Sequence, residues 1–409
     1  MNPRQISISE YDYELPEGRI AMHPPETRDA SKMLVYRNGE ITATAFLKIA
    51  DHLPSETLLV FNDTKVINAR IKFKKESGAG IEIFCLEPAG TVKEYNSIMN
   101  ATGTADWKCL VGGASKWKED KLEKQILIGE EKAVLYAEKN EQLSDSYIIR
   151  LSWLPASFTF AEVAEAAGNV PLPPYIKRNT EEADSARYQT VFAKQRGSVA
   201  APTAGLHFSA RIFERLSEKN IEKDFLTLHV GAGTFKPVKA ETMAEHEMHA
   251  EYIDVSLTTV ENIRKHLGSI TAVGTTSLRT LESLYWMGVK TILTPGLPGI
   301  SLGQWEVYEG KLSNAGISAD KALESLGNWM RRTGKENIFT QTRIIIAPGY
   351  IFRVVNILVT NFHQPRSTLL LLVAAAIGED WKKMYEYAME NDFRFLSYGD
   401  ANLIFINSR

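Results

Sequence analysis

The residues best suited to chemistry lie in the stretch Arg187–Phe208, which begins with charged and aromatic side chains and ends in a loop containing a proline, a glycine and a histidine. Proline fixes one backbone angle, and Gly205 allows conformations closed to other residues. We expect this loop to present Thr203 and His207 to a polar ligand. The structural alternative is an ordinary turn before a helix with Ser209 as its N-cap.

Two further segments contain histidines that could serve as proton-transfer or hydrogen-bonding groups, because the reference pKa of histidine is near neutral. One contains His246 and His249, and the other contains His363 at an expected strand end, where packing is the alternative role. His246 and His249 are three residues apart and could face one metal ion. The His-Glu-x-x-His spacing is absent, however, and no third ligand is evident nearby, so we expect no metal here.

A hydroxyl-rich segment, Gly274–Ser277, follows the apolar run 270–273 and precedes Arg279 and Glu282. Free backbone donors and hydroxyl groups at a helix N-terminus bind carboxylate or phosphate. Ordinary capping is the alternative for the hydroxyl groups. Arg279 and Glu282 can share one helix face, so an intrahelical ion pair competes with ligand binding.

These residues lie at the ends of apolar runs that alternate with helical segments, a pattern typical of α/β proteins. The expected strands are Thr57–Phe61, Phe225–Val230, Ile270–Val273, Ile344–Ala347 and Ile357–Thr360. The expected helices include Phe160–Ala167, one that runs through Met287, and Ser318–Arg332. The continuous apolar character of the first run predicts burial on both faces, as in a parallel sheet. Ligands bind such sheets beyond the carboxyl ends of the strands, so we expect the following loops to gather there.

From about Arg70 to Trp153, short alternating runs separated by polar clusters predict a small antiparallel barrel or sandwich. The runs are Ile71–Phe73, Gly80–Phe84, Gln125–Ile128, Ala133–Tyr136 and Tyr147–Leu151. We therefore expect an α/β main domain, formed by residues 1–69 and 154–409, with an inserted small antiparallel β-barrel domain over 70–153. Basic and acidic residues balance in the insertion, so any nucleic-acid contact there would depend on patterning. We interpret its lysines as a solvated edge that blocks aggregation.

The composition is that of a globular protein with more than one domain: 409 residues, of which 44% are hydrophobic and 24% charged. A net charge of -3 argues against a generic polyanion binder, so a nucleic-acid partner would need a local basic patch. The two cysteines, Cys85 and Cys109, show no metal-type spacing. No signal sequence is evident, and the apolar run Leu369–Ile377 is far shorter than the roughly 20 residues of a membrane span. We expect a cytoplasmic protein without membrane association.

A series of short motifs, in order along nearly the whole chain, resembles those of one enzyme family. They are Leu59–Thr64, Val170–Arg178, Arg187–Val191, Ala201–Phe208, Leu228–Phe235, His246–Tyr252, Gly274–Ser283, Pro348–Tyr350, Asn361–Leu370 and Ser397–Ala401. The sequence resembles the S-adenosylmethionine:tRNA ribosyltransferase-isomerases of queuosine biosynthesis. It departs from the family pattern at Gln364 and Arg366, where leucine and lysine are usual, and in the insertion Leu297–Asn337.

The resemblance implies an enzyme that transfers and isomerises the ribosyl moiety of S-adenosylmethionine onto 7-aminomethyl-7-deazaguanine at the tRNA wobble position. The implied products are epoxyqueuosine-tRNA, adenine and methionine. It implies tRNA and S-adenosylmethionine as partners, with no metal and no permanently bound cofactor, and we expect a monomer. The alternatives are a non-catalytic or divergent tRNA-binding paralogue, and a metal-dependent hydrolase that uses His246 and His249.

Site residues follow from matching this chemistry to residue types in the motifs. A base must remove a C5′ proton next to the sulfonium, and a donor would assist the departure of adenine. The proton-transfer candidates are His207, His229, His249, Glu251 and Asp400. The aromatic rings of Tyr188, Phe208 and Tyr350 could face the cationic sulfonium of the substrate. All the expected substrate contacts are Asp63, Arg187, Tyr188, Thr203, Gly205, Phe208, Thr234, Phe235, Thr275, Thr276, Ser277, Arg279, Glu282, Tyr350, Asn361, His363, Ser367 and Tyr398. The expected tRNA phosphate contacts are Lys177, Arg178, Lys194, Arg196 and Arg366.

Overall fold

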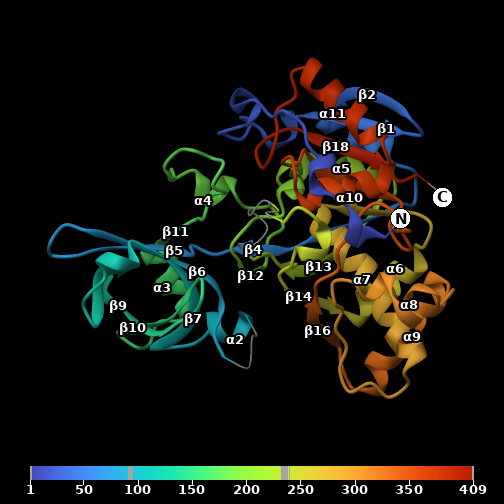
Figure 1. Ribbon diagram of the computed structural model, residues 1–409. Helices are drawn as coiled ribbons and strands as arrows, with labels where there is room; N and C mark the ends of the chain where they lie inside the picture. The colour runs from blue at the N-terminus through green and yellow to red at the C-terminus, as the bar shows by residue number, and fades with distance from the viewer. Residues whose placement is uncertain (1, 91–94, 232–237, 239, 408–409) are drawn as a thin grey trace.

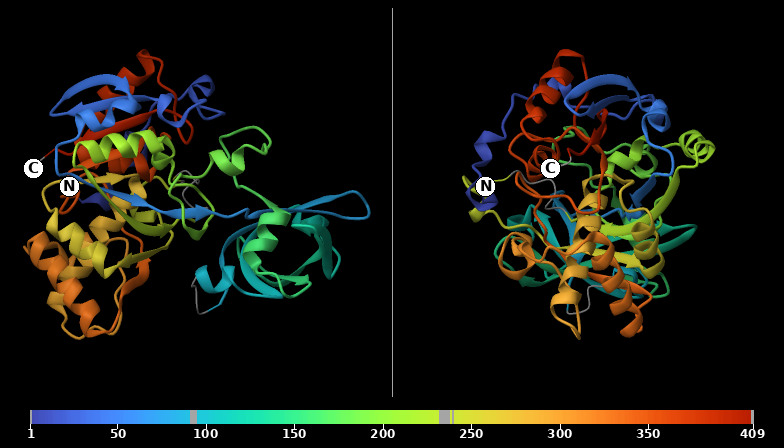
Figure 2. Two further views of the ribbon diagram at one scale, coloured as in Figure 1. Left: turned by 180° about the vertical axis from the view of Figure 1, so that it is seen from behind. Right: turned by 90° about the vertical axis from the view of Figure 1, so that its right-hand side faces the viewer.

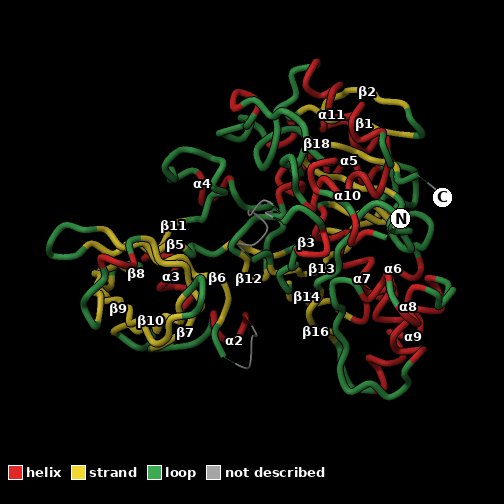
Figure 3. The backbone as a smooth tube through the Cα atoms, in the orientation of Figure 1, coloured by secondary structure: helices red, strands yellow, loops and turns green. Residues whose placement is uncertain are grey.

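The protein is built from a nine-stranded mixed sheet with helices on both faces and a seven-stranded antiparallel sheet that curls beside it (Figure 1). The computed structural model describes residues 2–90, 95–231, 238 and 240–407. Figure 2 shows the two parts from behind and from one side, and Figure 3 shows how strands and helices are distributed between them. Of the described helices, none is long and apolar enough to span a membrane.

Four parallel strands form the centre of the large sheet, whose order is β16-β14-β13-β3-β15-β17-β18-β1-β2. The central strands are β13 (Glu222–His229), β3 (Leu58–Asn62), β15 (Ile270–Val273) and β17 (Ile357–Asn361). The flanking strands are β14 (Glu251–Ser256), β16 (Asn337–Thr342), β18 (Ala401–Phe405), β1 (Lys32–Arg37) and β2 (Glu40–Ala45). Because the central strands are parallel, their carboxyl ends meet at one edge of the sheet.

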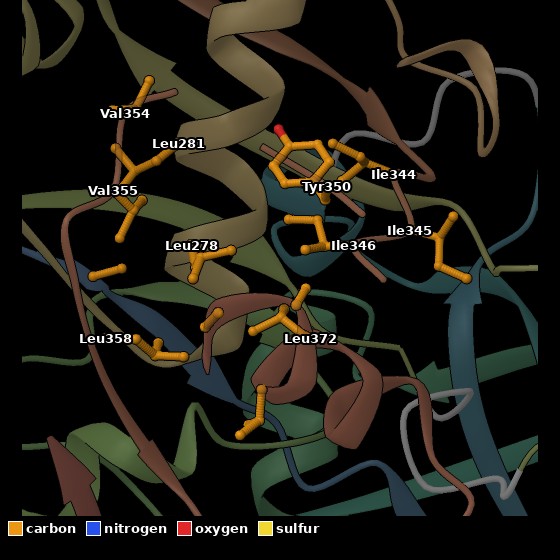
Figure 4. Packing of buried hydrophobic residues seen from close by; sticks show 14 of the residues in the cluster. Leu278, Leu281, Ile344, Ile345, Ile346, Tyr350, Val354, Val355, Leu358 and Leu372 are labelled. Carbon is orange, nitrogen blue, oxygen red and sulfur yellow. The ribbon is translucent and has the colours of Figure 1, made fainter. Parts of the chain in front are cut away.

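Strand β3 is buried along its whole length, which confirms the prediction from its apolar run. Leu58 and Val60 belong to the core on one face, with Leu278 and Leu281 of helix α7. The alternate residues belong to a second core on the other face, with residues of α1 (Ile49–His52) and α5 (Ala210–Glu218). Figure 4 shows the first core, where Leu278 lies near Leu358 of β17 and Leu281 lies near Val354 and Val355. Helices thus cover both faces of the sheet.

Helix α7 (Thr275–Leu293) packs against α9 (Ala319–Arg332), and the layer also contains α6 (Leu257–Lys265). The helix continues past Met287, where we expected it to end. A Cβ atom at Gly288 would lie 2.1 Å from the carbonyl oxygen of Ala322 in α9, so glycine here allows the two helices to approach closely instead of ending one of them.

The other predicted helix boundaries are close to those observed. Ser209 caps α5, Ser318 caps α9, and α3 spans Phe160–Ala167. Helices α10 (Thr368–Ile377) and α11 (Asp380–Glu390) follow β17 along the chain. The capping serines accept hydrogen bonds from backbone amides that would otherwise be free at each helix start.

The segment Ile344–Ala347 is buried but is not the strand that its apolar run predicts. Two of its carbonyl groups accept hydrogen bonds from Arg279 Nε and Tyr308 Oη, at 3.2 and 2.9 Å. Tyr308 Oη also accepts a hydrogen bond from the amide of Ala347, at 3.3 Å. Side chains thus satisfy backbone groups that a neighbouring strand would satisfy in a sheet.

The second sheet has the order β11-β5-β6-β7-β10-β9-β8. Its strands are β5 (Arg70–Lys74), β6 (Gly80–Pro88), β7 (Thr104–Gly112), β8 (Lys121–Ile128), β9 (Glu131–Gln142), β10 (Tyr147–Leu154) and β11 (Gly168–Asn169). All are antiparallel to their neighbours, as predicted, although β7 was not among the predicted strands. Among the described residues no pairing joins β8 to β5 or β11, and α3 contacts both β5 and β8 instead. The curl is therefore filled by a helix and is not closed by hydrogen bonds.

A short parallel pair links the two parts of the molecule. The chain leaves the large sheet through β4 (Thr64–Val66) and comes back to it through α4 (Asp184–Arg187) and β12 (Gln195–Ser198), which pairs with β4. Helix α2 (Tyr95–Met99) also approaches the large sheet, because the ring of Tyr95 stacks on His229 with centroids 4.3 Å apart. These contacts place the curled sheet next to the carboxyl edge of the large sheet.

Candidate active site

A cavity of about 440 Å³ opens where the central strands end. Most of its wall comes from four parts of the chain: residues 200–204, residues 245–251, the start of α7, and the loop after β17. Tyr175, Gly231 and Ser397 also line it. The predicted site residues that line it are Thr203, His249, Glu251, Thr275, Thr276, Arg279, Asn361, His363 and Ser367. The expected gathering of strand-end loops at one edge is thus confirmed.

The start of α7 reaches this wall because of Gly274. Its φ of 92° lies in the region that favours glycine, and its amide donates to the carbonyl of Val359 at 2.8 Å, tying the end of β15 to β17. Gly274 has no side chain to cap the helix. Thr275 and Thr276 therefore stand at the positive end of a long helix, facing the cavity.

Arg279 and Glu251 form an ion pair in the cavity wall, from Nη1 to Oε2, and their side chains are only 8% and 6% exposed. Arg279 Nε donates to the carbonyl of Ile344 at 3.2 Å. The third nitrogen, Nη2, is buried and has no hydrogen-bond partner within the described part of the chain. The guanidinium is thus held in place on two sides with one donor group left over.

The intrahelical pair between Arg279 and Glu282 is not formed, although the spacing allowed it. Glu282 accepts hydrogen bonds from Tyr350 Oη at 2.7 Å and from the backbone amides of Arg353–Val355 at 2.9 to 3.0 Å. Burial raises the pKa of this carboxyl group. Glu282 and Tyr350 therefore lie outside the cavity lining, where they hold a loop against α7.

His207 lies directly behind the cavity wall and is 3% exposed. Its Nδ1 is 2.8 Å from Ser31 Oγ, and its Nε2 is 3.1 Å from Asn361 Nδ2. Burial lowers the pKa of His207 to about 3, with Arg394 and Arg28 adding to the effect. The ring is consequently neutral, with Nε2 accepting from the Asn361 amide.

Thr203 and Asn361 complete this network on the cavity side. Thr203 Oγ1 donates to Asn361 Oδ1 at 2.7 Å, so the amide is held at both ends. His363 also lines the cavity, with its Nε2 2.9 Å from Thr360 Oγ1, and burial lowers its pKa to about 3. The cavity wall after β17 is thus a set of oriented, neutral hydrogen-bonding groups.

His229 and Asp63 lie at the ends of central strands but do not line the cavity, because β12 covers them. His229 Nδ1 is 3.2 Å from Thr64 Oγ1, and burial lowers its pKa to about 4. Asp63 accepts a hydrogen bond from Thr227 Oγ1 at 2.7 Å, and burial raises its pKa. Both side chains connect elements in the interior.

The other predicted contacts are buried away from the cavity, half-buried in the case of Arg187, or outside the described residues. Those that do not line the cavity are Arg187, Tyr188, Gly205, Phe208, Ser277, Tyr398 and Asp400, and Thr234 and Phe235 lie outside the described residues. Phe208 packs edge-on against the rings of Phe46 and Phe61, and the Asp400 carboxylate accepts from the amides of Lys32 and Arg394. Large apolar rings and backbone-capping carboxylates are used here for packing and chain connection.

Every basic residue predicted to contact phosphate has a partner within the protein. Lys177 pairs with Glu17, Arg178 with Asp184, Arg196 with Glu165 and Arg366 with Asp12, and Lys194 lies over the ring of Phe225. Of these, the Arg178 pair is the most enclosed, with two hydrogen bonds of 2.7 Å to a buried carboxylate. Exposed pairs such as that of Lys177 are easily exchanged for another anion.

Several cavity residues were not predicted from the sequence. They are Tyr175, Glu245, Glu247, Met248 and Ser397. Tyr175 Oη and Ser397 Oγ are 2.7 Å apart, and both residues fall within motifs that carried the resemblance, which is the signal that could have identified them. Within the described ranges, no three His, Cys, Asp or Glu side chains are grouped so as to hold a metal ion.

Comparison with known proteins places the chain in a family. Residues 8–404 match the family described as queuosine biosynthesis protein. Relatives named S-adenosylmethionine:tRNA ribosyltransferase-isomerase include one from Magnetococcus marinus, 35% identical over 97% of this chain and 94% of the relative, and one from Trichlorobacter lovleyi, 37% identical over 97% and 99%. The crystal structure of an S-adenosylmethionine tRNA ribosyltransferase from Thermotoga maritima is 29% identical, with a TM-score of 0.45 and coverage of 97% of this chain and 100% of that one. This chain therefore belongs to the queuosine biosynthesis protein family.

Proposed function

We propose that this protein is an S-adenosylmethionine:tRNA ribosyltransferase-isomerase that acts in the cytoplasm. It transfers and isomerises the ribosyl moiety of S-adenosylmethionine onto 7-aminomethyl-7-deazaguanine at the tRNA wobble position, releasing adenine and methionine. The observation that carries the proposal is a cavity with polar and charged side chains in its wall, at the carboxyl edge of the large sheet, in a chain related over nearly its whole length to enzymes of that name.

The charges around the cavity suit S-adenosylmethionine. Its described wall contains the carboxylates of Glu245, Glu247 and Glu251 and the single guanidinium of Arg279. The substrate has a sulfonium, an ammonium and one carboxylate, so a wall with more negative than positive groups complements it. A free phosphate group would meet repulsion from the same carboxylates.

The cavity also limits which histidine acts as a proton acceptor. His249 is an exposed residue of the cavity wall, and we assign it to proton transfer at C5′. Glu251 is the carboxylate alternative, although one of its oxygens is already paired with Arg279. His207 acts as a positioning residue through Asn361, and His229 as one that holds β4 against the large sheet through Thr64.

We infer that residues 70–153 form an inserted domain whose core is completed by α3, while 1–69 and 154–409 form the α/β domain. Residues of this core include Trp107 and Trp153, against which Phe160 of α3 packs. Lys177 lies between β11 and α4, and Arg196 lies in β12, so both belong to the segments that connect the two sheets. Their side chains are partly open to solvent, and we expect them to contact tRNA phosphates. The protein would act as a monomer.

Incubating the protein with S-adenosylmethionine and tRNA that contains 7-aminomethyl-7-deazaguanine tests the proposal. We expect stoichiometric release of adenine and a tRNA mass increase, and neither with tRNA that contains guanine at the wobble position. Tight tRNA binding without adenine release would instead identify a non-catalytic paralogue. Activity on other substrates that is lost to a chelator would favour a metal-dependent hydrolase.

A further inference from the structure

One donor group in the cavity wall is left without a partner. Arg279 is 7% exposed, lines the cavity, and has its Nη1 on Glu251 and its Nε on the carbonyl of Ile344. Its Nη2 has no hydrogen-bond partner within the described part of the chain. A buried, unpaired donor on a charged group costs stability, so a site of this kind is well suited to an anionic ligand atom.

A second anion-binding feature lies one turn away on the same helix. Thr275 is four residues before Arg279, so both residues face the same side of α7. The helix begins there after a glycine that provides no cap, and both threonines of its first turn line the cavity. The positive end of the helix dipole and the guanidinium therefore lie at the same part of the cavity wall.

The neighbouring charges are negative, which selects the kind of anion. Glu251 is bonded to the guanidinium itself, and Glu245 and Glu247 lie on the same segment of the wall. A phosphate group would be repelled by these carboxylates. A ligand that has a carboxylate and an ammonium on adjacent atoms would place one against Arg279 and the other against the acidic segment.

We propose that Arg279 and the N-terminus of α7 form a subsite for the α-amino-acid group of a ligand, with the carboxylate at the Arg279 guanidinium and the ammonium facing Glu251. This inference rests on the proposed function for the identity of the amino acid, which is the methionine portion of S-adenosylmethionine. The pair formed with Glu251 holds the guanidinium in one orientation before the ligand arrives. Lysine would keep the charge but could not present this fork of donors.

The test compares S-adenosylmethionine with its decarboxylated analogue in adenine release, using wild type and Arg279→Lys. For wild type we expect loss of the carboxylate to raise KM about 10- to 100-fold. In Arg279→Lys the two substrates should differ by less than about threefold, because the charge-assisted hydrogen bond has already been lost. Arg343→Lys is the matched control, since Arg343 is exposed, lies outside the cavity lining, and pairs only loosely with Glu247 at 3.7 Å.

The outcomes separate this inference from the proposed function. Suppose that adenine is released but Arg279→Lys raises KM equally for S-adenosylmethionine and its decarboxylated analogue, or raises KM for tRNA alone. Either result overturns the subsite and leaves the proposed function standing. If wild type releases no adenine, calorimetry with L-methionine and with 3-(methylthio)propylamine, which lacks the carboxylate, decides the subsite separately. Binding of L-methionine alone supports it, and equal or absent binding of both overturns it. This comparison uses wild type, so it does not depend on the variant folding.

Discussion

His207 acts on the cavity through a neighbour and does not line it. Its neutral ring accepts a hydrogen bond from Asn361 Nδ2, and Thr203 Oγ1 donates to the oxygen of the same amide. The two contacts remove the freedom of the amide to rotate by half a turn. Asn361 is therefore held with one orientation toward whatever occupies the cavity.

If His207 works only through Asn361, the effects of replacing them should not add. We expect Asn361→Ala to lower kcat/KM for adenine release by about 10²-fold and His207→Ala by about 10-fold. The double variant should be no worse than Asn361→Ala alone. His207→Gln keeps an acceptor for the amide and should restore most of the activity.

His23→Ala serves as a control, since His23 is exposed and contacts only Glu181 among the described side chains. Losses that multiply in the double variant would show that His207 has a separate role. An inflection in the kcat/KM–pH profile near pH 6.5 that disappears in His207→Gln would also contradict the assignment, because the buried ring has a pKa of about 3.

At the residue scale, the sequence was enough to predict the loops of the site but not which of their side chains reach the cavity. Thr203 and His207 belong to one short 3-10 helix, yet only the threonine lines the cavity. His229 ends a central strand, as a site residue would, but the ring of Tyr95, more than 100 positions away in the sequence, stacks on it. The spacing of residues in a sequence cannot show that a distant segment of the chain will bury a given side chain.

At the scale of elements, α7 holds the site in place through its far side as well as its first turn. Glu282 anchors the helix to the loop Arg353–Val355, which leads directly into β17 and the cavity wall after it. A helix fixed at its sheet-facing core and at this carboxylate cannot rotate to move Arg279. The anchor therefore contributes to the geometry of the cavity without touching it.

Removing the Glu282 carboxylate should destabilise the fold more than an ordinary surface substitution. Glu282→Ala leaves three backbone amides without an acceptor, and we expect the free energy of unfolding in urea to fall by about 3 kcal/mol. Glu282→Gln keeps one acceptor oxygen and should cost less. Glu386→Ala, at an exposed position of α11, should change the free energy by less than about 0.5 kcal/mol. Equal effects for Glu282→Ala and Glu386→Ala would show that the anchor is not needed.

Elements with a strong periodic pattern were predicted well, and those shaped by specific hydrogen bonds were not. The apolar runs of β3, β13, β15 and β17 identified the centre of the sheet. The run Ile344–Ala347 looked the same, but Arg279 and Tyr308 satisfy its backbone in place of a strand. β7 was missed because its inward residues, Ala105, Trp107 and Cys109, include only one large strand former.

For the whole molecule, three buried neutral histidines make stability depend on pH. Burial lowers the pKa of His207 and His363 to about 3 and that of His229 to about 4. An unfolded chain binds protons at these residues below about pH 6.5, whereas the folded chain does not until the pH is much lower. The stability contributed by each neutral ring is therefore complete above about pH 6.5 and is lost as the pH falls toward 3 to 4.

Urea unfolding at pH 7.5, 6.5 and 5.5 measures this effect. We expect the free energy of unfolding to fall below about pH 6.5, with each histidine adding up to about 1.4 kcal/mol per pH unit to the slope. His363→Gln should reduce the slope of the unfolding free energy against pH by up to about 1.4 kcal/mol per pH unit. A free energy that stays constant between pH 7.5 and 5.5 would show that these rings are protonated in the folded protein.

The position of β18 also determines when the molecule can be completed during its synthesis. Among the described strands, β1 pairs with β2 on one side and is joined to the rest of the large sheet through β18 alone (Figure 2). Residues 32–37 must therefore wait for residues 401–405. A chain emerging from the ribosome can therefore assemble its curled sheet early, but its large sheet remains without this edge until translation has passed β18. The cavity, whose wall includes residues after β17, is likewise incomplete until those residues have been made.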